Sequence, residues 1–153
     1  MDLSASITLS ADAALAAALC AVDPAGLGGV ALRAPSGPLR DTWLGLLKQS
    51  LPTGTPLLRV PHHASDAALL GGLDLAATLQ AGRPVAQRGL LARADGGLLL
   101  LAMAERCSAN VAAHLSAALD TQRVQLQRDG LSTCEPARFG LVALDEGNDD
   151  ERL

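Results

Sequence analysis

The chain has 153 residues, and its 12 basic and 16 acidic side chains leave a formal net charge of −4. This balance excludes a nucleic-acid binder that depends on a basic surface. Hydrophobic residues make up 49% of the chain, which indicates one compact globular domain and not a disordered segment. The chain has one tryptophan, Trp43, one phenylalanine, Phe139, and no tyrosine. A ligand cage or a base-stacking platform built from aromatic rings is therefore excluded as well.

The cysteines and the apolar runs indicate where such a chain resides. Cys20, Cys107 and Cys134 are an odd number at wide spacing, which favours buried free thiols in a reducing compartment over disulfides or a zinc site. A signal peptide needs a basic start, and the first basic residue is Arg33. The apolar runs at residues 13–22 and 98–104 are both shorter than the roughly 20 residues that cross a bilayer. We expect a cytoplasmic protein without a membrane span.

The first half of the chain alternates between helix and strand signals. The predicted elements are a helix from the N-cap Ser10 to just before Pro24, a loop at 26–29, a strand at 30–32, a helix at 39–51 and a strand at 57–60. The helix at 39–51 places Leu39, Trp43, Leu46 and Leu47 on one face, which we expect to be buried. Strand, tight loop and helix in this order are typical of an α/β unit.

The second half contains the strongest strand signal. The predicted elements are a helix at 73–80, irregular or hairpin structure at 82–92, a strand at 98–101, a helix from the N-cap Ser108 to about Leu119, a hairpin around Asp129-Gly130 and a strand at 139–144. The four leucines at 98–101 are a continuous apolar run, as in a strand that is buried on both faces. The alternation predicts a parallel α/β sheet, in which ligands bind at the carboxyl ends of the strands.

The loop after the first predicted strand is where a P-loop nucleotidase carries the motif GxxxxGK[ST]. The corresponding positions here are Ala34, Pro35, Ser36, Gly37, Pro38, Leu39, Arg40 and Asp41. Side chains replace both glycines of the motif and crowd the amides that would hold a phosphate. Arg40 stands in the place of the lysine, and Asp41 replaces the hydroxyl that would bind Mg²⁺. By itself, this loop is a strand-to-helix turn without the chemistry of phosphate transfer.

A second altered site follows the apolar strand at 98–101. A Walker B motif places two acids there, one that holds Mg²⁺ and one that polarises water. This chain has Ala102 and Met103, which can do neither. The nearest acid is Glu105, which we expect to be a solvated residue at the entry of a helix.

The histidines do not predict a metal site. His62 and His63 are adjacent, and neighbouring side chains of an extended segment point to opposite faces, so we expect two surface residues that do not share a metal. His114 is expected on the face of the helix that follows Ser108.

Two further segments resemble the AAA+ module of magnesium chelatases. They are residues 66–79, which include Leu-Leu-Gly-Gly-Leu-Asp-Leu, and residues 89–97, which read Gly-Leu-Leu-Ala-Arg-Ala-Asp-Gly-Gly. With them, residues 10–153 line up with the family: a degenerate P-loop, the insert, the Walker B strand, a hairpin and a sensor-1 strand. The resemblance is to the D subunit, whose N-terminal AAA+ module has lost the ATPase motifs that the I subunit keeps.

The resemblance implies a fold, a function and a set of partners. It implies that residues 1–153 are an AAA+ P-loop-type parallel sheet flanked by helices, with an insert and a β-hairpin, but without the family's fifth strand, lid, acidic proline-rich linker and integrin-like domain. It implies a platform that assembles with the ATPase (I) subunit in hexameric rings and acts with the porphyrin-binding large (H) subunit. Together they insert Mg²⁺ into protoporphyrin IX in chlorophyll or bacteriochlorophyll synthesis. ATP and Mg²⁺ would be used by the partner ATPase, and this module would bind no cofactor firmly.

The resemblance also assigns roles to individual positions. Asp145 falls at the sensor-1 position, the arginine finger would lie beyond Leu153, and we expect the acidic run 145–151 to be a solvated loop. We expect the insert to be an interaction element, because its glycines permit close backbone approach, although they could equally serve a tight turn. The expected interface residues are Leu70, Gly71, Gly72, Leu73 and Asp74.

Two other interpretations remain open at this point. The chain could be a weakly active ATPase that binds nucleotide through a rearranged loop, with Arg40 in place of the lysine. It could also be an unrelated small α/β interaction domain, which would have no affinity for a chelatase ATPase subunit. Self-association is a further possibility, since an open sheet edge can pair with another chain.

Overall fold

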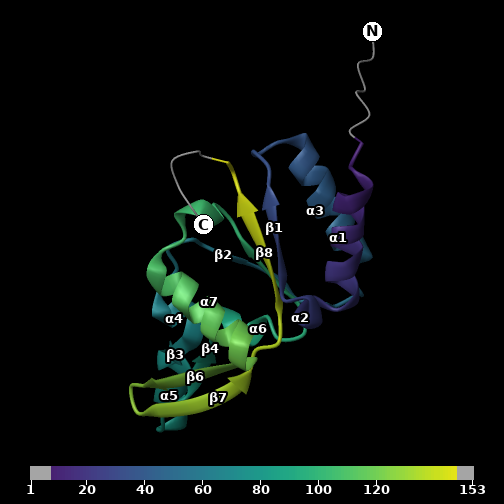
Figure 1. The fold of residues 1–153 in the computed structure, drawn as a ribbon. Helices are drawn as coiled ribbons and strands as arrows, with labels where there is room; N and C mark the ends of the chain where they lie inside the picture. The colour runs from purple at the N-terminus through teal and green to yellow at the C-terminus, as the bar shows by residue number, and fades with distance from the viewer. Residues whose placement is uncertain (1–7, 148–153) are drawn as a thin grey trace.

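The computed structural model describes residues 8–147, and a parallel sheet of four strands lies at its centre (Figure 1). The strand order is β1 (Gly29–Arg33), β8 (Gly140–Asp145), β5 (Leu98–Leu101) and β2 (Leu57–Val60). All three pairings are parallel. The predicted parallel α/β fold is confirmed. The carboxyl ends of β1 and β8 lie side by side, because Arg33 pairs in register with Asp145.

One face of the sheet is covered by α1 (Ala11–Val22) and α3 (Pro38–Ser50). Ser10 caps α1 as predicted, with its side chain accepting a hydrogen bond from the amide of Ala13. Trp43 of α3 is buried against this face, and its indole donates to the carbonyl oxygen of Ala13 at 2.7 Å, which joins the two helices. Leu39 was expected on the same buried face, but it lies in the first turn of α3 and is 50% exposed.

The other face is covered by α4 (Asp66–Leu70), α6 (Leu90–Arg93) and α7 (Ala109–Thr121). Leu99 and Leu101 of β5 point to this side, and all four residues of β5 are buried, as the apolar run predicts. Ser108 caps α7 as predicted. The helix α4 was not predicted, since five residues carry too little periodicity to identify a helix.

The predicted hairpin is present, as β6 (Arg123–Arg128) and β7 (Leu131–Pro136). Asp129 and Gly130 both have positive φ, 52° and 76°. This is the conformation that a two-residue turn of type I′ requires, and Asp-Gly is one of its preferred sequences.

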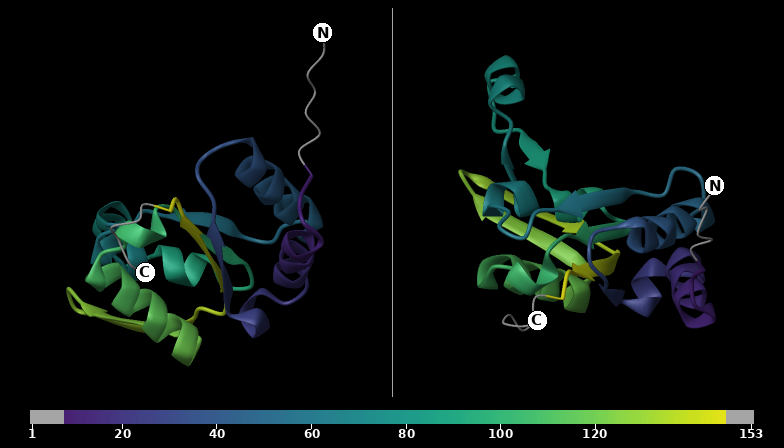
Figure 2. Two further views of the ribbon diagram at one scale, coloured as in Figure 1. Left: turned by 45° about the horizontal axis from the view of Figure 1, so that its top comes forward. Right: turned by 90° about the horizontal axis from the view of Figure 1, so that it is seen from above.

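Residues 71–88 form a projection that we call the arm, made of β3 (Gly71–Leu73), α5 (Leu75–Ala81) and β4 (Ala86–Arg88) (Figure 2). The strands β3 and β4 pair in antiparallel fashion at its base, and α5 lies beyond them. The helix predicted at 73–80 is therefore correct except at its start, where Leu73 belongs to a strand. The segment 82–92, expected to be irregular or a hairpin, contains the single strand β4, which pairs with β3 across α5, and the start of α6 (Leu90–Arg93), so it holds no hairpin of its own.

Two glycines let the backbones cross where the arm joins the body. A Cβ atom on Gly71 would lie 2.2 Å from the carbonyl oxygen of Gln87, and one on Gly89 would lie 2.3 Å from the amide nitrogen of Gly71. Real atoms do not approach so closely, so both positions require glycine. Gly72 differs from them, because no atom lies within 4 Å of its Cβ position.

Several smaller expectations are wrong. Residues 26 and 27, expected in a loop at 26–29, belong to a short helix, α2 (Pro24–Leu27). Only Cys20 is buried, whereas Cys107 is half-buried and Cys134 is exposed. His62 and His63 lie in a turn, not in an extended segment, so their rings touch, with Nδ1 of His63 at 3.3 Å from Nε2 of His62.

Within residues 8–147, no helix has the length and apolar character to span a bilayer.

Candidate functional site

The degenerate loop lies at the carboxyl edge of the sheet, as the parallel topology demands. It connects β1 to α3, and its first amide, that of Ala34, donates to the carbonyl oxygen of Asp145 at 2.9 Å. Gly37 is the N-cap residue of α3 and has no side chain to cap the helix, and Pro38 follows at the first helical position. The loop and the segment after β8 are thus held together by backbone contacts.

A carboxylate of the chain itself occupies the position facing this loop. Glu146 Oε1 accepts a hydrogen bond from the Ser36 hydroxyl at 2.8 Å and one from Arg40 Nη1 at 3.1 Å. Arg40 Nη2 also donates to Ser36 Oγ at 2.6 Å, which closes a triangle that we call the Ser36–Arg40–Glu146 cluster. The Ser36 hydrogen bond and the Arg40 guanidinium lower the pKa of Glu146. The cation that stands in place of the P-loop lysine is therefore already neutralised.

Asp145, at the expected sensor-1 position, has partners other than those of this cluster. It accepts from the amide of Gly147 at 2.8 Å and from Arg33 Nε at 2.9 Å, and these bonds lower its pKa. It is 3% exposed at the end of β8. The expectation of a solvated acidic loop is therefore wrong for Asp145, because the strand continues through it, and residues 148–151 lie outside the described residues.

Glu105 is also buried, and not solvated as expected. It belongs to the 3₁₀ turn η1 (Ala104–Arg106) and is 7% exposed. Its Oε2 accepts from the amide of Glu146 at 3.2 Å, while its Oε1 has no hydrogen-bond partner within residues 8–147. The acid nearest to the Walker B position thus holds the backbone of the segment that carries Glu146.

The residues at this edge are poorly suited to bind and cleave a triphosphate. The one lysine of the chain, Lys48, lies in the last turn of α3, at the other end of that helix from the loop. Ala102 and Met103 follow β5 where acids would hold Mg²⁺ and activate water. Three carboxylates, those of Glu105, Asp145 and Glu146, are instead joined by hydrogen bonds to this edge. Within the part of the chain that the structure describes, no three His, Cys, Asp or Glu residues are grouped as metal ligands.

The expected interface residues lie at the base of the arm. Leu70 ends α4 and is half-buried, and Gly71 serves the internal backbone crossing. Gly72 and Leu73 lie in β3 and are partly exposed. Asp74 caps α5, with Oδ1 accepting from the amide of Ala77 at 2.9 Å. Gly71 thus permits a close approach between two backbone segments of the chain itself. The space beside Gly72 is open and could admit another molecule.

Sequence reasoning missed the role of Glu146. Its partners Ser36 and Arg40 are 110 and 106 residues away in the chain, so no local pattern connects them. A signal existed nonetheless. An acid directly after a strand of a parallel sheet lies at the same edge as the loop after a neighbouring strand.

Comparisons with known proteins agree on one family. Residues 44–146 match the family model described as magnesium chelatase, subunit ChlI. The chain is 45% identical over 135 residues to the magnesium-chelatase 60 kDa subunit of Cereibacter sphaeroides, an alignment that covers 88% of this chain and 21% of that subunit. It is 28% identical over 124 residues to the magnesium-chelatase 38 kDa subunit of Rhodobacter capsulatus, covering 80% of this chain and 35% of that subunit.

A solved structure extends the agreement to three dimensions. The fold is similar to a chain in the complex between subunits BchI and BchD of magnesium chelatase, which is based on a single-particle cryo-EM reconstruction. The TM-score is 0.68 at 25% sequence identity, and the match covers 92% of this chain and 53% of that one. The chain spans about a fifth of the length of the 60 kDa relative. The family model matches more than half of the chain, which therefore belongs to the magnesium chelatase family.

Proposed function

We propose that this chain is the N-terminal AAA+ module of a magnesium chelatase D subunit and that it does not hydrolyse ATP. In this proposal, it is a platform that assembles in hexameric rings with the ATPase (I) subunit, which uses ATP and Mg²⁺. The rings act with the porphyrin-binding large (H) subunit to insert Mg²⁺ into protoporphyrin IX, a step of chlorophyll or bacteriochlorophyll synthesis. This module binds no cofactor firmly and contributes contacts, not chemistry.

The observation that carries the proposal is the Ser36–Arg40–Glu146 cluster. A P-loop stabilises the transferred phosphoryl group with a lysine, backbone amides and a bound Mg²⁺. Here the only cation of the loop, Arg40, is bound by Glu146 at 3.1 Å. A triphosphate would have to displace this carboxylate and would meet Asp145 and Glu105 nearby. Removal of even one preorganised group of this kind costs roughly 10²–10³ in rate in a working enzyme, and this site lacks several.

The relatives also favour the D subunit. The identity is higher to the 60 kDa subunit, at 45%, than to the 38 kDa subunit, at 28%. The alignment covers 21% of the 60 kDa relative, so most of that protein lies outside the region that this chain matches.

The test is a measurement of ATP binding and turnover, first by the chain alone and then with a competent ATPase subunit of the family. Calorimetry measures binding, and phosphate release measures turnover. We expect no turnover by the chain alone, together with complex formation or an altered rate in the mixture. A double substitution, Arg40→Ala with Glu146→Ala, is the matched control, because it removes the cluster and should leave the mixed rate unchanged if the loop performs no chemistry.

Two results would contradict the proposal. Magnesium-dependent turnover by the chain alone, abolished by Arg40→Ala, would show a weakly active ATPase in which Arg40 replaces the lysine. No interaction with the ATPase subunit in any nucleotide state would indicate a different role within the family.

A further inference from the structure

The arm carries apolar side chains that the rest of the chain does not cover. Leu75 and Leu79 are 68% and 84% exposed, and no residue of α5 is buried. They are four positions apart, so they lie on the same face of the helix, about 6 Å apart along its axis. Figure 2 shows that the arm projects away from the sheet and its covering helices, so α5 cannot reach the body of its own chain.

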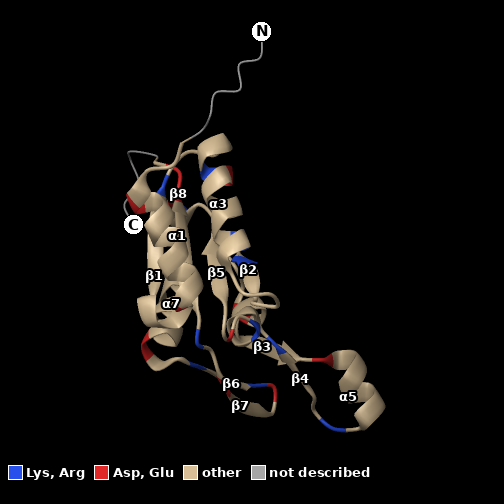
Figure 3. Ribbon diagram, turned by 90° about the vertical axis from the view of Figure 1, so that its right-hand side faces the viewer, with Lys and Arg blue, Asp and Glu red and all other residues tan. Residues whose placement is uncertain are grey.

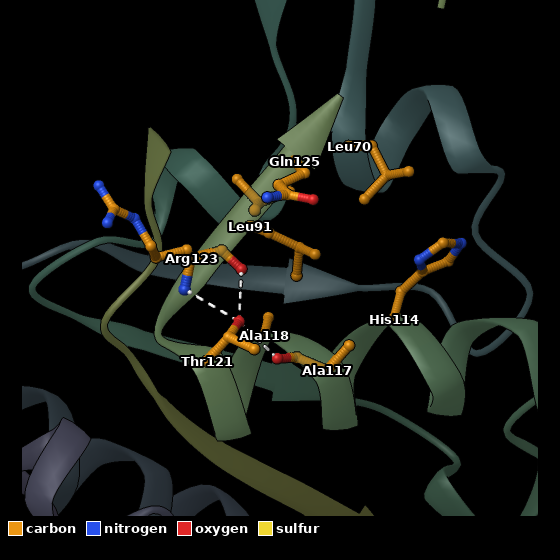
Figure 4. A pocket seen from close by; sticks show the side chains of 9 residues that line it. Leu70, Leu91, His114, Ala117, Ala118, Thr121, Arg123 and Gln125 are labelled. Atoms are coloured by element: carbon orange, nitrogen blue, oxygen red, sulfur yellow. Dashed lines mark hydrogen bonds between the residues drawn. The ribbon is translucent and has the colours of Figure 1, made fainter. Parts of the chain in front are cut away.

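A groove with matching chemistry lies on the body of the molecule (Figure 4). It runs between α7 on one side and α4, α6 and β6 on the other, with a cavity of about 310 Å³. Its walls include Leu70, Leu91, Ala117, Ala118 and Val124. The lining residues of α7, which are His114, Ala117, Ala118 and Thr121, follow one face of that helix, and the two alanines leave room for another helix to approach. We call this the α7 groove.

Charges at the two ends of the arm helix are opposite to those at the two ends of the groove. Asp74 precedes α5 and Arg83 follows it, whereas α5 itself is uncharged (Figure 3). Arg123 lies at one end of the α7 groove. Asp66 lies at the other end, where it is bound to His114 and Asn110. Neither Arg83 nor Arg123 has an ion-pair partner within residues 8–147.

The lengths of the two helical surfaces agree as well. Helix α5 has seven residues, with Asp74 and Arg83 just beyond its ends. The groove-lining residues of α7 run over seven positions from His114, which is bound to Asp66, to Thr121, and Arg123 follows. At 1.5 Å per residue, each helical span is about 10 Å. An arm helix lying antiparallel to α7 would bring Asp74 to Arg123 and Arg83 to Asp66, with both leucines over the groove.

We infer that the arm of one copy of this chain docks into the α7 groove of a second copy, with Leu75 and Leu79 seated in the groove and the two charge pairs at its ends. The contact joins two different surfaces of the same chain, so it is head-to-tail, the type that builds rings or filaments. It goes beyond the proposed function, because it does not depend on whether the chain hydrolyses ATP. A chain that turned over ATP would refute the proposed function and leave this contact intact.

The experiment is sedimentation equilibrium of the whole chain, with one variant for each side of the contact. Leu79→Arg places a charge on the arm, and Ala117→Arg fills the groove. Both positions are on helix surfaces, so the fold is retained, which circular dichroism checks. We expect each variant to weaken self-association by at least tenfold, as substitutions at the centre of an interface do. The matched control is Leu19→Arg, since Leu19 of α1 is also an exposed leucine, at 48%, but lies on the other side of the sheet.

A mixture of the two variants provides the sharper test. The Leu79→Arg chain keeps an intact groove, and the Ala117→Arg chain keeps an intact arm. Together they have one complete contact, so we expect the mixture to form heterodimers although neither variant associates alone. Arg123→Asp should also weaken association, whereas Arg123→Lys should retain it.

Four outcomes would overturn the inference. The first is wild-type chain that stays monomeric at every concentration tested. The second is association that Ala117→Arg leaves unchanged. The third is association that Leu19→Arg abolishes as well, which would assign the contact to the exposed face of α1. A mixture that stays monomeric would show that the arm and the groove do not meet each other.

Discussion

Replacement of Gly71 by alanine tests whether the backbone crossing at the base of the arm holds the fold together. Gly71 has φ of 95° and ψ of −171°, a conformation that only glycine adopts readily. Its Cβ position is also 2.2 Å from the carbonyl oxygen of Gln87 and 2.9 Å from the amide nitrogen of Gly89, and both are backbone atoms that cannot rotate away.

The expected loss of stability has two parts. Backbone strain of this kind costs about 1–3 kcal/mol. Overpacking of a filled position costs about 1–3 kcal/mol more. Gly71→Ala should therefore lower the free energy of unfolding by about 2–6 kcal/mol, a large share of the roughly 5–15 kcal/mol that typical domains have.

Two neighbouring glycines provide internal controls. Gly89 has an ordinary φ of −80°, and an added Cβ would lie 2.3 Å from the carbonyl oxygen of Leu69, so Gly89→Ala should cost the overpacking part alone, about 1–3 kcal/mol. Gly72 has open space at its Cβ position, so Gly72→Ala should change stability by no more than about 0.5 kcal/mol. The predicted order of damage is Gly71, then Gly89, then Gly72.

The assay is urea unfolding followed by tryptophan fluorescence. Trp43 is the single tryptophan and is 1% exposed, so its emission reports the loss of the core. The midpoint should fall in the predicted order while the slope with urea stays constant. Equal midpoints for the Gly71 and Gly72 variants would refute the reasoning, because they would show that the crossing opens without cost.

Three further predictions concern the core, the carboxylates and the thiols. Leu47 is 0% exposed between α3 and the sheet, so Leu47→Ala should lower the free energy of unfolding by about 2–5 kcal/mol in the same urea assay. The pKa values of Asp145 and Glu146 are lowered in the folded chain, so their contribution to stability is present above the ordinary carboxyl range and is lost as the pH falls through the lowered values. The urea midpoint should therefore fall as the pH is lowered from neutral to about pH 3. If the midpoint of Glu146→Gln falls by as much as that of the wild-type chain, the effect belongs to other groups. Cys134 is exposed, whereas Cys20 is buried and its burial raises the pKa of its thiol. A thiol reagent under native conditions should therefore modify Cys134 before Cys20, as measured by mass spectrometry of the labelled peptides. Modification of Cys20 first would contradict the burial of that residue.

The elements that the sequence predicted correctly are those whose signals are local and long enough to be unambiguous. The four leucines of β5 are buried on both faces, as a continuous apolar run indicates. Ser10 and Ser108 begin helices of 12 and 13 residues, and Asp129-Gly130 makes the turn that its two residues favour. In each case, the physical cause lies within a few residues of its effect.

The sequence was a poorer guide where elements are short or where their partners are distant. The arm combines two strands of three residues each around a helix of seven, and the pairing of β3 with β4 across that helix has no local signature. Leu39 shows the same limit, because its position on a periodic face does not reveal which other elements cover that turn of the helix.

The departure from the ATPase motifs is a prediction from the sequence itself, since Arg40, Asp41, Ala102 and Met103 stand at the positions where the motifs are expected to have other residues. What contacts the loop was decided only by the tertiary structure. The parallel pairing of β1 with β8 brings Glu146 to the loop that holds Ser36 and Arg40, more than 100 residues earlier in the chain. A missing group can be identified residue by residue, whereas a contact between two strand ends exists only once the sheet has formed.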